Sequence, residues 1–125
     1  MEETKINEIL KGYIEAVLFT EKNDEDKEFF EGVDFTFENF TSDSIDKAIN
    51  DIKQFLKDAG EVAVKEAVDL DGLYKLGINI LLTRNGHGSG FFDYEYENEN
   101  LLIDAADKLD EVYLDVNFDG KLILV

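Results

Sequence analysis

Arginine and histidine each occur once in this chain of 125 residues, and the two lie three positions apart in one glycine-rich segment. The segment reads Arg84-Asn85-Gly86-His87-Gly88-Ser89-Gly90 and is followed by Phe91-Phe92-Asp93. A guanidinium, an imidazole that titrates near neutral pH, an amide, a hydroxyl and a carboxylate could together bind a ligand or move a proton. We therefore predict a binding site made of Arg84, Asn85, His87, Ser89 and Asp93.

The same segment also has a purely structural interpretation, and both interpretations stay open. Asn85-Gly86 is typical of a tight β-hairpin turn, because both residues tolerate a positive φ. Three alternate glycines exceed what such a turn needs, and they suit a backbone that approaches a ligand closely. The spacing does not match a phosphate-binding P-loop, which requires a lysine after its last glycine.

Ser89, His87 and Asp93 also allow a catalytic interpretation, with a nucleophile, a base and a group that orients the base. Proximity in sequence does not establish it, since such sites are defined by their geometry and by an oxyanion hole. We expect binding rather than catalysis, and a small enzyme or ligand-binding module using this segment is kept as the alternative. Zinc is not expected, because a single histidine in a chain without cysteine leaves only carboxylates as further ligands.

Asp115-x-Asn117-x-Asp119-Gly120 repeats the first half of an EF-hand calcium loop. The flanking residues 112–116 and 122–124 alternate as strands do, whereas an EF-hand requires helices there. We therefore predict a β-hairpin with a two-residue turn, no metal site and no cofactor. Weak binding of a divalent cation by the acidic surface stays open.

The chain is strongly acidic, with 30 Asp and Glu residues against 12 Lys and Arg residues and a net charge of −18. A compact chain of this length is about 35 Å across, and duplex DNA of that length carries on the order of 20 negative charges. We therefore expect no direct binding to nucleic acid, whereas a protein that grips DNA would be attracted to this surface. Acidity for solubility alone is the simpler alternative. The candidate contacts in the densest acidic run are Glu21, Asp24, Glu25, Asp26 and Glu28.

Composition favours one folded domain over residues 1–125. Ten Phe and five Tyr residues argue against disorder, because disordered acidic chains are poor in aromatic residues. The absence of cysteine excludes disulfides and thiol chemistry. No apolar run approaches the roughly 18 residues of a membrane span, and the N-terminus does not resemble a secretion signal. We expect a soluble, cytoplasmic protein without a membrane partner.

Residue periodicity predicts an α+β fold. Two N-terminal helices are expected to pack on a roughly four-stranded antiparallel sheet, with one further helix before a C-terminal β-hairpin. The helices are predicted at residues 4–19, 45–56 and 101–109, where apolar residues recur three and four positions apart. The second helix follows four residues that could each cap it, Thr41, Ser42, Asp43 and Ser44.

The remaining elements follow from alternation and from glycine. Residues 78–82 and 91–96 are predicted as paired strands, because apolar and polar residues alternate in both. Residues 71–76 are predicted as a short helical turn that Gly77 closes, and residues 33–37 as an extended piece.

Residues 82–93 resemble a motif, L-T-R-N-G-H-G-[AS]-G-F-W-D, of small uncharacterised proteins from tailed bacteriophages and related mobile elements. In that family a helix and a short Asp-Gly hairpin follow the motif, as residues 103–125 do here. This chain differs at Phe92, where tryptophan is usual, and at Tyr94, where a basic residue often stands. The resemblance implies a phage protein in the host cytoplasm and assigns no chemistry to Arg84 or His87.

Charge and resemblance together predict a non-enzymatic protein that binds a host protein with a basic surface. Such a protein would mimic nucleic acid and so inhibit a nucleic-acid-handling or defence factor of the host. A structural or self-associating role is a third possibility, because the apolar segment 122–125 could pair with a neighbouring strand edge. The oligomeric state is left open.

Overall fold

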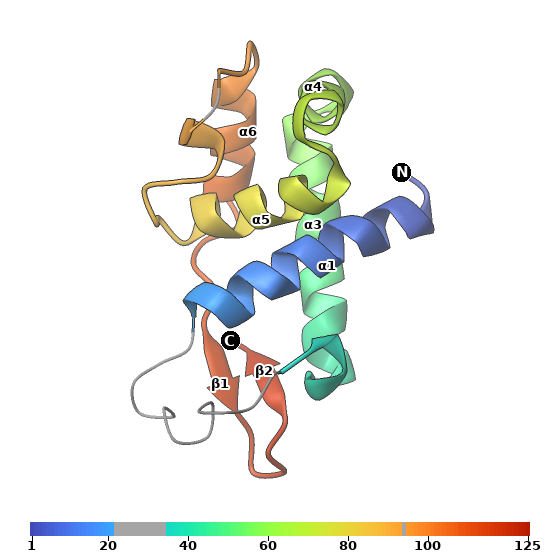
Figure 1. The fold of residues 1–125 in the computed structure, drawn as a ribbon, viewed down its shortest axis with the longest axis vertical. Coiled ribbons are helices and arrows are strands. Elements are labelled where there is room, and N and C mark those ends of the chain that lie inside the picture. Colours follow the sequence, from blue (N-terminus) through green and yellow to red (C-terminus); the bar gives the residue numbers. More distant parts are fainter. Residues whose placement is uncertain (22–34, 94) are drawn as a thin grey trace.

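The structure is a computed structural model that describes residues 1–21, 35–93 and 95–125. The described chain forms five α-helices and one two-stranded antiparallel sheet. Figure 1 shows α1 and α5 side by side across α3, with α4 and α6 towards one end of α3 and the β-hairpin towards the other. The elements are α1 (Glu3–Thr20), η1 (Phe37–Asn39), α3 (Ser42–Ala59), α4 (Glu61–Asp71), α5 (Leu73–Arg84), η2 (Phe91–Asp93), α6 (Glu99–Asp107), β1 (Leu114–Val116) and β2 (Leu122–Leu124).

The predicted four-stranded sheet is wrong, because residues 78–82 are part of a helix and residues 91–93 form a 3-10 turn. Helix α5 packs against several other helices and buries both apolar and polar side chains around its circumference. Such a helix loses the one-sided apolar stripe that identifies a surface helix. The alternation at Ile78, Ile80 and Leu82 therefore imitated a strand, and the fold is mainly helical.

Three helices with one wet face were predicted correctly. The predicted helices at residues 4–19, 45–56 and 101–109 are confirmed as α1, α3 and α6. Helix α4, which also has one exposed face, was not predicted. Of the four capping candidates before α3, Thr41 is the cap, since its hydroxyl oxygen accepts the backbone N–H of Ser44 at 3.2 Å.

Of two shorter predictions, one is wrong and the other holds in part. Gly77 does not close a turn at residues 71–76, because Gly72, with a φ of 89°, separates α4 from α5 and α5 runs through Gly77. Of the predicted extended piece, Thr36 is extended, Phe37 begins the 3-10 turn η1, and residues 33 and 34 lie outside the described residues.

Two glycines allow α1 and α5 to approach each other closely. A Cβ on Gly12 would overlap the carbonyl oxygen of Tyr74, and a Cβ on Gly77 would overlap the carbonyl oxygen of Ile9. Both obstacles are backbone atoms, so no side chain can rotate away to make room. Glycine is therefore required at both positions by the distance between the two helix axes.

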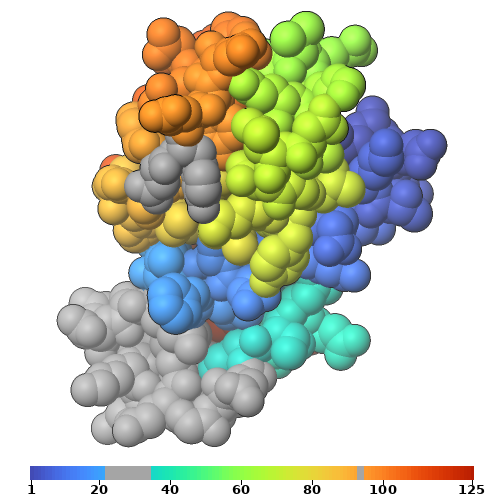
Figure 2. Space-filling view, turned by 45° about the horizontal axis from the view of Figure 1, so that its top comes forward, coloured from blue at the N-terminus to red at the C-terminus, as the bar shows by residue number. Residues whose placement is uncertain are grey.

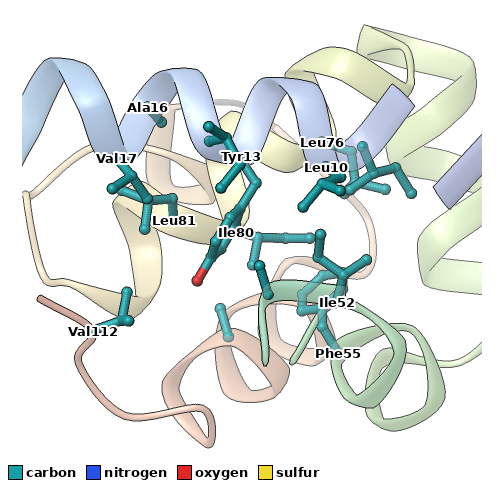
Figure 3. Packing of buried hydrophobic residues seen from close by; sticks show 14 of the residues in the cluster. Leu10, Tyr13, Ala16, Val17, Ile52, Phe55, Leu76, Ile80, Leu81 and Val112 are labelled. Atoms are coloured by element: carbon teal, nitrogen blue, oxygen red, sulfur yellow. The ribbon is translucent and has the colours of Figure 1, made fainter. Parts of the chain in front are cut away.

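The core lies between α1, α3 and α5. Figure 3 shows Ile52 and Phe55 of α3 on the opposite side of this core from Leu10 and Tyr13 of α1. Each of these four side chains is at most 1% exposed.

The C-terminal β-hairpin is confirmed, with Asp115 opposite Ile123, but its turn is longer than predicted. Asn117 N–H donates to the carbonyl of Lys121 at 2.9 Å, so three residues form the loop, and Gly120 has a φ of 76°. This is a typical three-residue hairpin, in which a turn is followed by a left-handed glycine. The Asn117 side chain closes the loop by accepting the N–H groups of Asp119 and Lys121.

The outer edge of β2 is covered by the start of α3. The carbonyl of Leu122 accepts the N–H of Thr41 at 3.0 Å, and the N–H of Leu124 donates to the Ser44 hydroxyl oxygen at 3.0 Å. Pairing with a strand of another molecule requires free backbone groups at that edge. The contacts at this edge therefore give no support to self-association through residues 122–124.

Helix α6 is capped by a side chain from another helix. The carboxylate of Glu66, on α4, accepts the backbone N–H groups of Glu97 at 2.6 Å and Asn98 at 2.9 Å. Partial desolvation raises the pKa of Glu66, but the N–H groups of Asn98 and Glu97 outweigh it and leave the pKa below the ordinary value of 4.5. Glu66 therefore fixes α4 to the start of α6 in its ionised form.

Glu66 should make part of the stability depend on pH. A folded-state pKa below the unfolded value gives a contribution that is complete above about pH 4.5 and is lost as the pH falls through the folded pKa. We expect Glu66→Gln to weaken the acid-induced loss of unfolding free energy between pH 5 and pH 3, measured by urea titration. Glu61→Gln, on the exposed start of α4, is the control. Equal pH dependence in the two variants would contradict the capping role.

Candidate functional site

The glycine-rich segment begins as the end of a helix rather than as a hairpin turn. The N–H of His87 donates to the carbonyl of Leu82, and that of Gly86 to Thr83, each at 3.1 Å. Together with the φ of 67° at Gly86, this pair of bonds is the Schellman motif that ends many helices. The predicted hairpin turn at Asn85-Gly86 is therefore wrong. The sequence does not distinguish the two structures, because a glycine with a positive φ is favoured both at the end of a helix and in a tight turn.

Arg84 lies inside the protein, and its side chain is only 1% exposed. The guanidinium donates to the carboxylate of Asp51 at 2.9 Å and to the Tyr13 hydroxyl oxygen at 2.8 Å. It also donates to the carbonyls of Leu109 at 2.6 Å and Asp110 at 2.7 Å, just beyond the end of α6. Arg84 thus joins α1, α3, α5 and the exit of α6, and it makes no contribution to an open binding surface.

The pKa of the Tyr13 hydroxyl, which lies beside this buried cation, is changed by its surroundings. Burial raises the pKa of Tyr13 to about 12, while the charge of Arg84 lowers it and that of Asp51 raises it. Figure 3 shows the hydroxyl pointing away from α1 into the interior. Tyr13 is therefore neutral at physiological pH, and Asp51 supplies the charge that balances Arg84.

Asn85 also serves the fold. Its amide nitrogen donates to the carbonyl of Val112, and its amide oxygen accepts the N–H of Val112, both at 2.9 Å. The side chain satisfies both backbone groups of one residue, as a neighbouring strand would. Asn85 therefore holds the segment before β1 against the end of α5.

The far end of the glycine-rich segment is anchored in the core by Phe91. The Phe91 ring is fully buried and stacks on Phe55, with ring centroids 5.6 Å apart. Its N–H donates to the Thr83 hydroxyl oxygen at 3.1 Å. Residues 86–90 thus form a short loop held at both ends.

His87 and Ser89 are the predicted site residues that reach the surface of this loop. Nε2 of His87 lies 2.5 Å from Oε1 of Glu21, which also accepts the Thr20 hydroxyl at 3.0 Å. The loop is thereby fastened to the end of α1, and Glu21 is engaged in this contact. The remaining predicted residue, Asp93, ends η2, and its side chain lies outside the described part of the chain.

A hollow of about 420 Å³ lies where the loop, α1 and α5 meet. Apolar side chains of the two helices form most of its wall, and His87 and Ser89 of the loop complete the lining. Its volume falls within the range of small-molecule sites. The lining residues are Glu15, Ala16, Phe19, Thr20, Ile78, Leu82, His87 and Ser89.

Sequence reasoning found the two loop residues of this hollow and missed the helical ones. Phe19 carried a usable signal in the sequence, because it is an apolar residue outside the apolar stripe of α1, and the structure leaves it 87% exposed. Ile78 and Leu82 carried none, since they were assigned to a strand. The acidic candidates Asp24, Glu25, Asp26 and Glu28 lie outside the described residues.

The described ranges contain neither a group of metal ligands nor a helix that could span a membrane. No cluster there of three or more His, Cys, Asp or Glu side chains could hold a metal ion. None of the described helices combines the length and the apolar character needed to cross a bilayer.

Comparison with known proteins identifies no relative. The chain matches no protein-family model, and it is significantly similar to no curated protein and to no solved structure. The resemblance of residues 82–93 to bacteriophage proteins therefore stays a prediction, and the function has to be inferred from the surface of this fold.

Proposed function

We propose that this chain acts by binding a host protein through an acidic surface that substitutes for nucleic acid. The partner has a basic surface and handles nucleic acid or acts in host defence. The setting is that of a phage or prophage protein in the host cytoplasm, without direct binding to DNA or RNA. The observation that carries the proposal is the distribution of charge around α6.

Residues 95–111 hold seven acidic residues and a single basic one, Lys108. We call this segment the acidic ridge. Six of its acids are exposed, and Glu99 is half-buried. Asp104 and Asp107 lie three positions apart, and so on the same face of α6. The exposed acids are Glu95, Glu97, Asp104, Asp107, Asp110 and Glu111.

The charge of this ridge approaches that of a short length of DNA only when the residues on both sides of α6 are included. The nine-residue helix α6 is about 14 Å long and holds three acidic residues, whereas duplex DNA of that length carries about eight phosphate charges. The residues before and after α6 bring the ridge to seven acidic residues. Figure 2 shows α6 and α4 side by side on one face, and Glu66 joins the two helices. The ridge is therefore backed by a second helix, as a surface that replaces a stiff polyanion requires.

The proposal is tested by displacement of host proteins from immobilised DNA. Basic proteins of a bacterial lysate are bound to DNA-cellulose and then eluted with increasing concentrations of this protein. We expect displacement at low ionic strength and its loss at high salt, because exposed charges are screened. A variant of this protein with Glu95→Gln, Glu97→Gln, Asp104→Asn and Asp107→Asn should give the same elution only at a concentration at least about tenfold higher.

A matched variant controls for total charge. Glu2→Gln, Glu3→Gln, Asp46→Asn and Asp119→Asn remove the same number of charges from exposed positions on α1, α3 and the hairpin. This variant should displace the same proteins as the wild type does. Equal weakening in both variants would show that net charge alone acts, and the proposed surface would be rejected.

A further inference from the structure

The hollow beside the glycine-rich loop is lined by both apolar and acidic residues. Ile78 and Leu82 of α5 and Phe19 of α1 supply apolar surface, and the exposed Glu15 of α1 is the acidic residue of the lining. The Tyr74 hydroxyl donates to Oε2 of Glu15 and fixes the position of that carboxylate. A ligand that fits must therefore combine an apolar body with a group that is compatible with a negative charge.

An anion is disfavoured at this hollow by the charges beside it. The carboxylates of Glu15 and Glu21 are negative and would repel an anion. Anion sites in glycine-rich loops depend on backbone N–H groups that point at the ligand. Three such groups are engaged here, since those of Gly86 and His87 donate to the carbonyls at the end of α5 and that of Phe91 donates to Thr83.

The same carboxylates that repel an anion attract a cation. Glu15 offers a carboxylate at the surface, and a net charge of −18 attracts cations to the molecule as a whole. The exposed Phe19 ring adds a second favourable contact, because the face of an aromatic ring attracts ammonium and guanidinium groups. The loop holds the hollow in shape through the bond between His87 and Glu21.

We propose that this hollow binds an organic cation, in which an amine or a guanidinium is carried on an apolar body. The cationic group lies against Glu15, and the apolar body lies against Ile78, Leu82 and Phe19. The site is separate from the acidic ridge and does not depend on the proposed partner. The ligand is either a free amine or the side chain of a basic protein, and the same chemistry serves both.

The test is a titration of the isotopically labelled protein with three probes of one shape, followed by the amide signals in NMR spectra. The probes are 2-phenylethylamine, 2-phenylethanol and 3-phenylpropionate, which carry a positive charge, no charge and a negative charge. We expect the amine to shift the signals of Leu82, His87 and Ser89 with a Kd of about 1 mM, as is usual for so small a ligand. The carboxylate should bind at least about tenfold more weakly than the amine.

Three variants locate the site. Glu15→Gln keeps the shape and the bond to Tyr74, and should weaken amine binding about threefold to fivefold without affecting the alcohol. Ser89→Trp fills the hollow and should abolish binding of both while the spectrum stays well dispersed. Glu8→Gln removes the same charge from α1 two turns away and should change nothing.

A fourth probe separates the two sources of the cation. Nα-acetyl-arginine amide represents the side chain of a protein, and tighter binding than that of 2-phenylethylamine would assign the hollow to a basic partner. Weaker binding would assign it to a free amine. Equal affinity for amine, alcohol and carboxylate, or shifts that do not centre on the loop, would overturn the proposal.

Discussion

Replacing Arg84 with methionine is expected to lower the free energy of unfolding by about 3–5 kcal/mol. The change keeps an unbranched chain of similar length and removes the donors for Asp51, Tyr13 and the two carbonyls after α6. The loss is large because acceptors would be left without partners in a region where water does not replace the guanidinium. Urea unfolding followed by circular dichroism measures it.

Lys47→Met is the matched control for this prediction. Nζ of Lys47 lies 3.5 Å from the same carboxylate oxygen of Asp51, but 43% of its side chain is exposed. An exposed ion pair of this kind contributes at most about 1 kcal/mol. Similar losses in the two variants would mean that Arg84 acts only as a nearby charge, and its role in joining the helices would have to be abandoned.

Alanine at Gly77 is expected to lower the free energy of unfolding by about 3 kcal/mol, the upper end of the range for overpacking. Alanine normally stabilises a helix interior by about 1 kcal/mol relative to glycine, so the sign of the effect is diagnostic. The added methyl group would overlap the carbonyl oxygen of Ile9, and α1 and α5 could accept it only by moving apart. Gly12→Ala, at the overlap with Tyr74, should behave in the same way.

Asn50→Ala is the control for this prediction. It places alanine in a helix without a steric conflict, because Asn50 lies on the exposed face of α3. Its unfolding free energy should equal that of the wild type within about 0.5 kcal/mol. A Gly77→Ala protein as stable as this control would show that the two helices are not held at the distance described.

Helices α1, α3 and α6 were predictable from the sequence because each has one dry and one wet face. In α1 the apolar residues recur three and four positions apart, and the buried side chains lie at these positions. The cap of α3 was predictable for a local reason, since Thr41 and Ser44 form it within one turn. Such features depend on neighbours in sequence and need no knowledge of the fold.

Helix α5 could not be predicted in this way, because other elements pack around it. The spacing of its apolar residues therefore does not follow the pattern of a helix with one exposed face. Leu76, Ile80 and Leu81 are buried together with the polar residues Asn79 and Thr83, so no wet face marks the helix. The buried polar groups have partners far along the chain, as Asn79 does in Tyr96 at 3.4 Å. Sequence alone does not reveal such partners, and a polar residue in an apolar run resembles the alternation of a strand.

The glycine-rich segment was predicted in part for the same reason. The rarity of arginine and histidine drew attention to Arg84 and His87, but rarity does not distinguish a buried tie from an exposed contact. The partners of Arg84 are separated from it by 25 to 71 positions, which no local pattern indicates. The loop residues His87 and Ser89 do line a hollow, whereas the apolar wall of that hollow comes from two helices.

The position of the acceptors of Arg84 along the chain bears on how this protein matures during synthesis. Tyr13 and Asp51 leave the ribosome before the guanidinium does, whereas the carbonyls of Leu109 and Asp110 follow 25 and 26 positions after it. A nascent chain that ends before these two residues holds a cation with half of its acceptors missing. The helices can therefore reach their final arrangement only after residues 109 and 110 have been synthesised, and shorter ribosome-bound fragments should be readily cleaved by proteases.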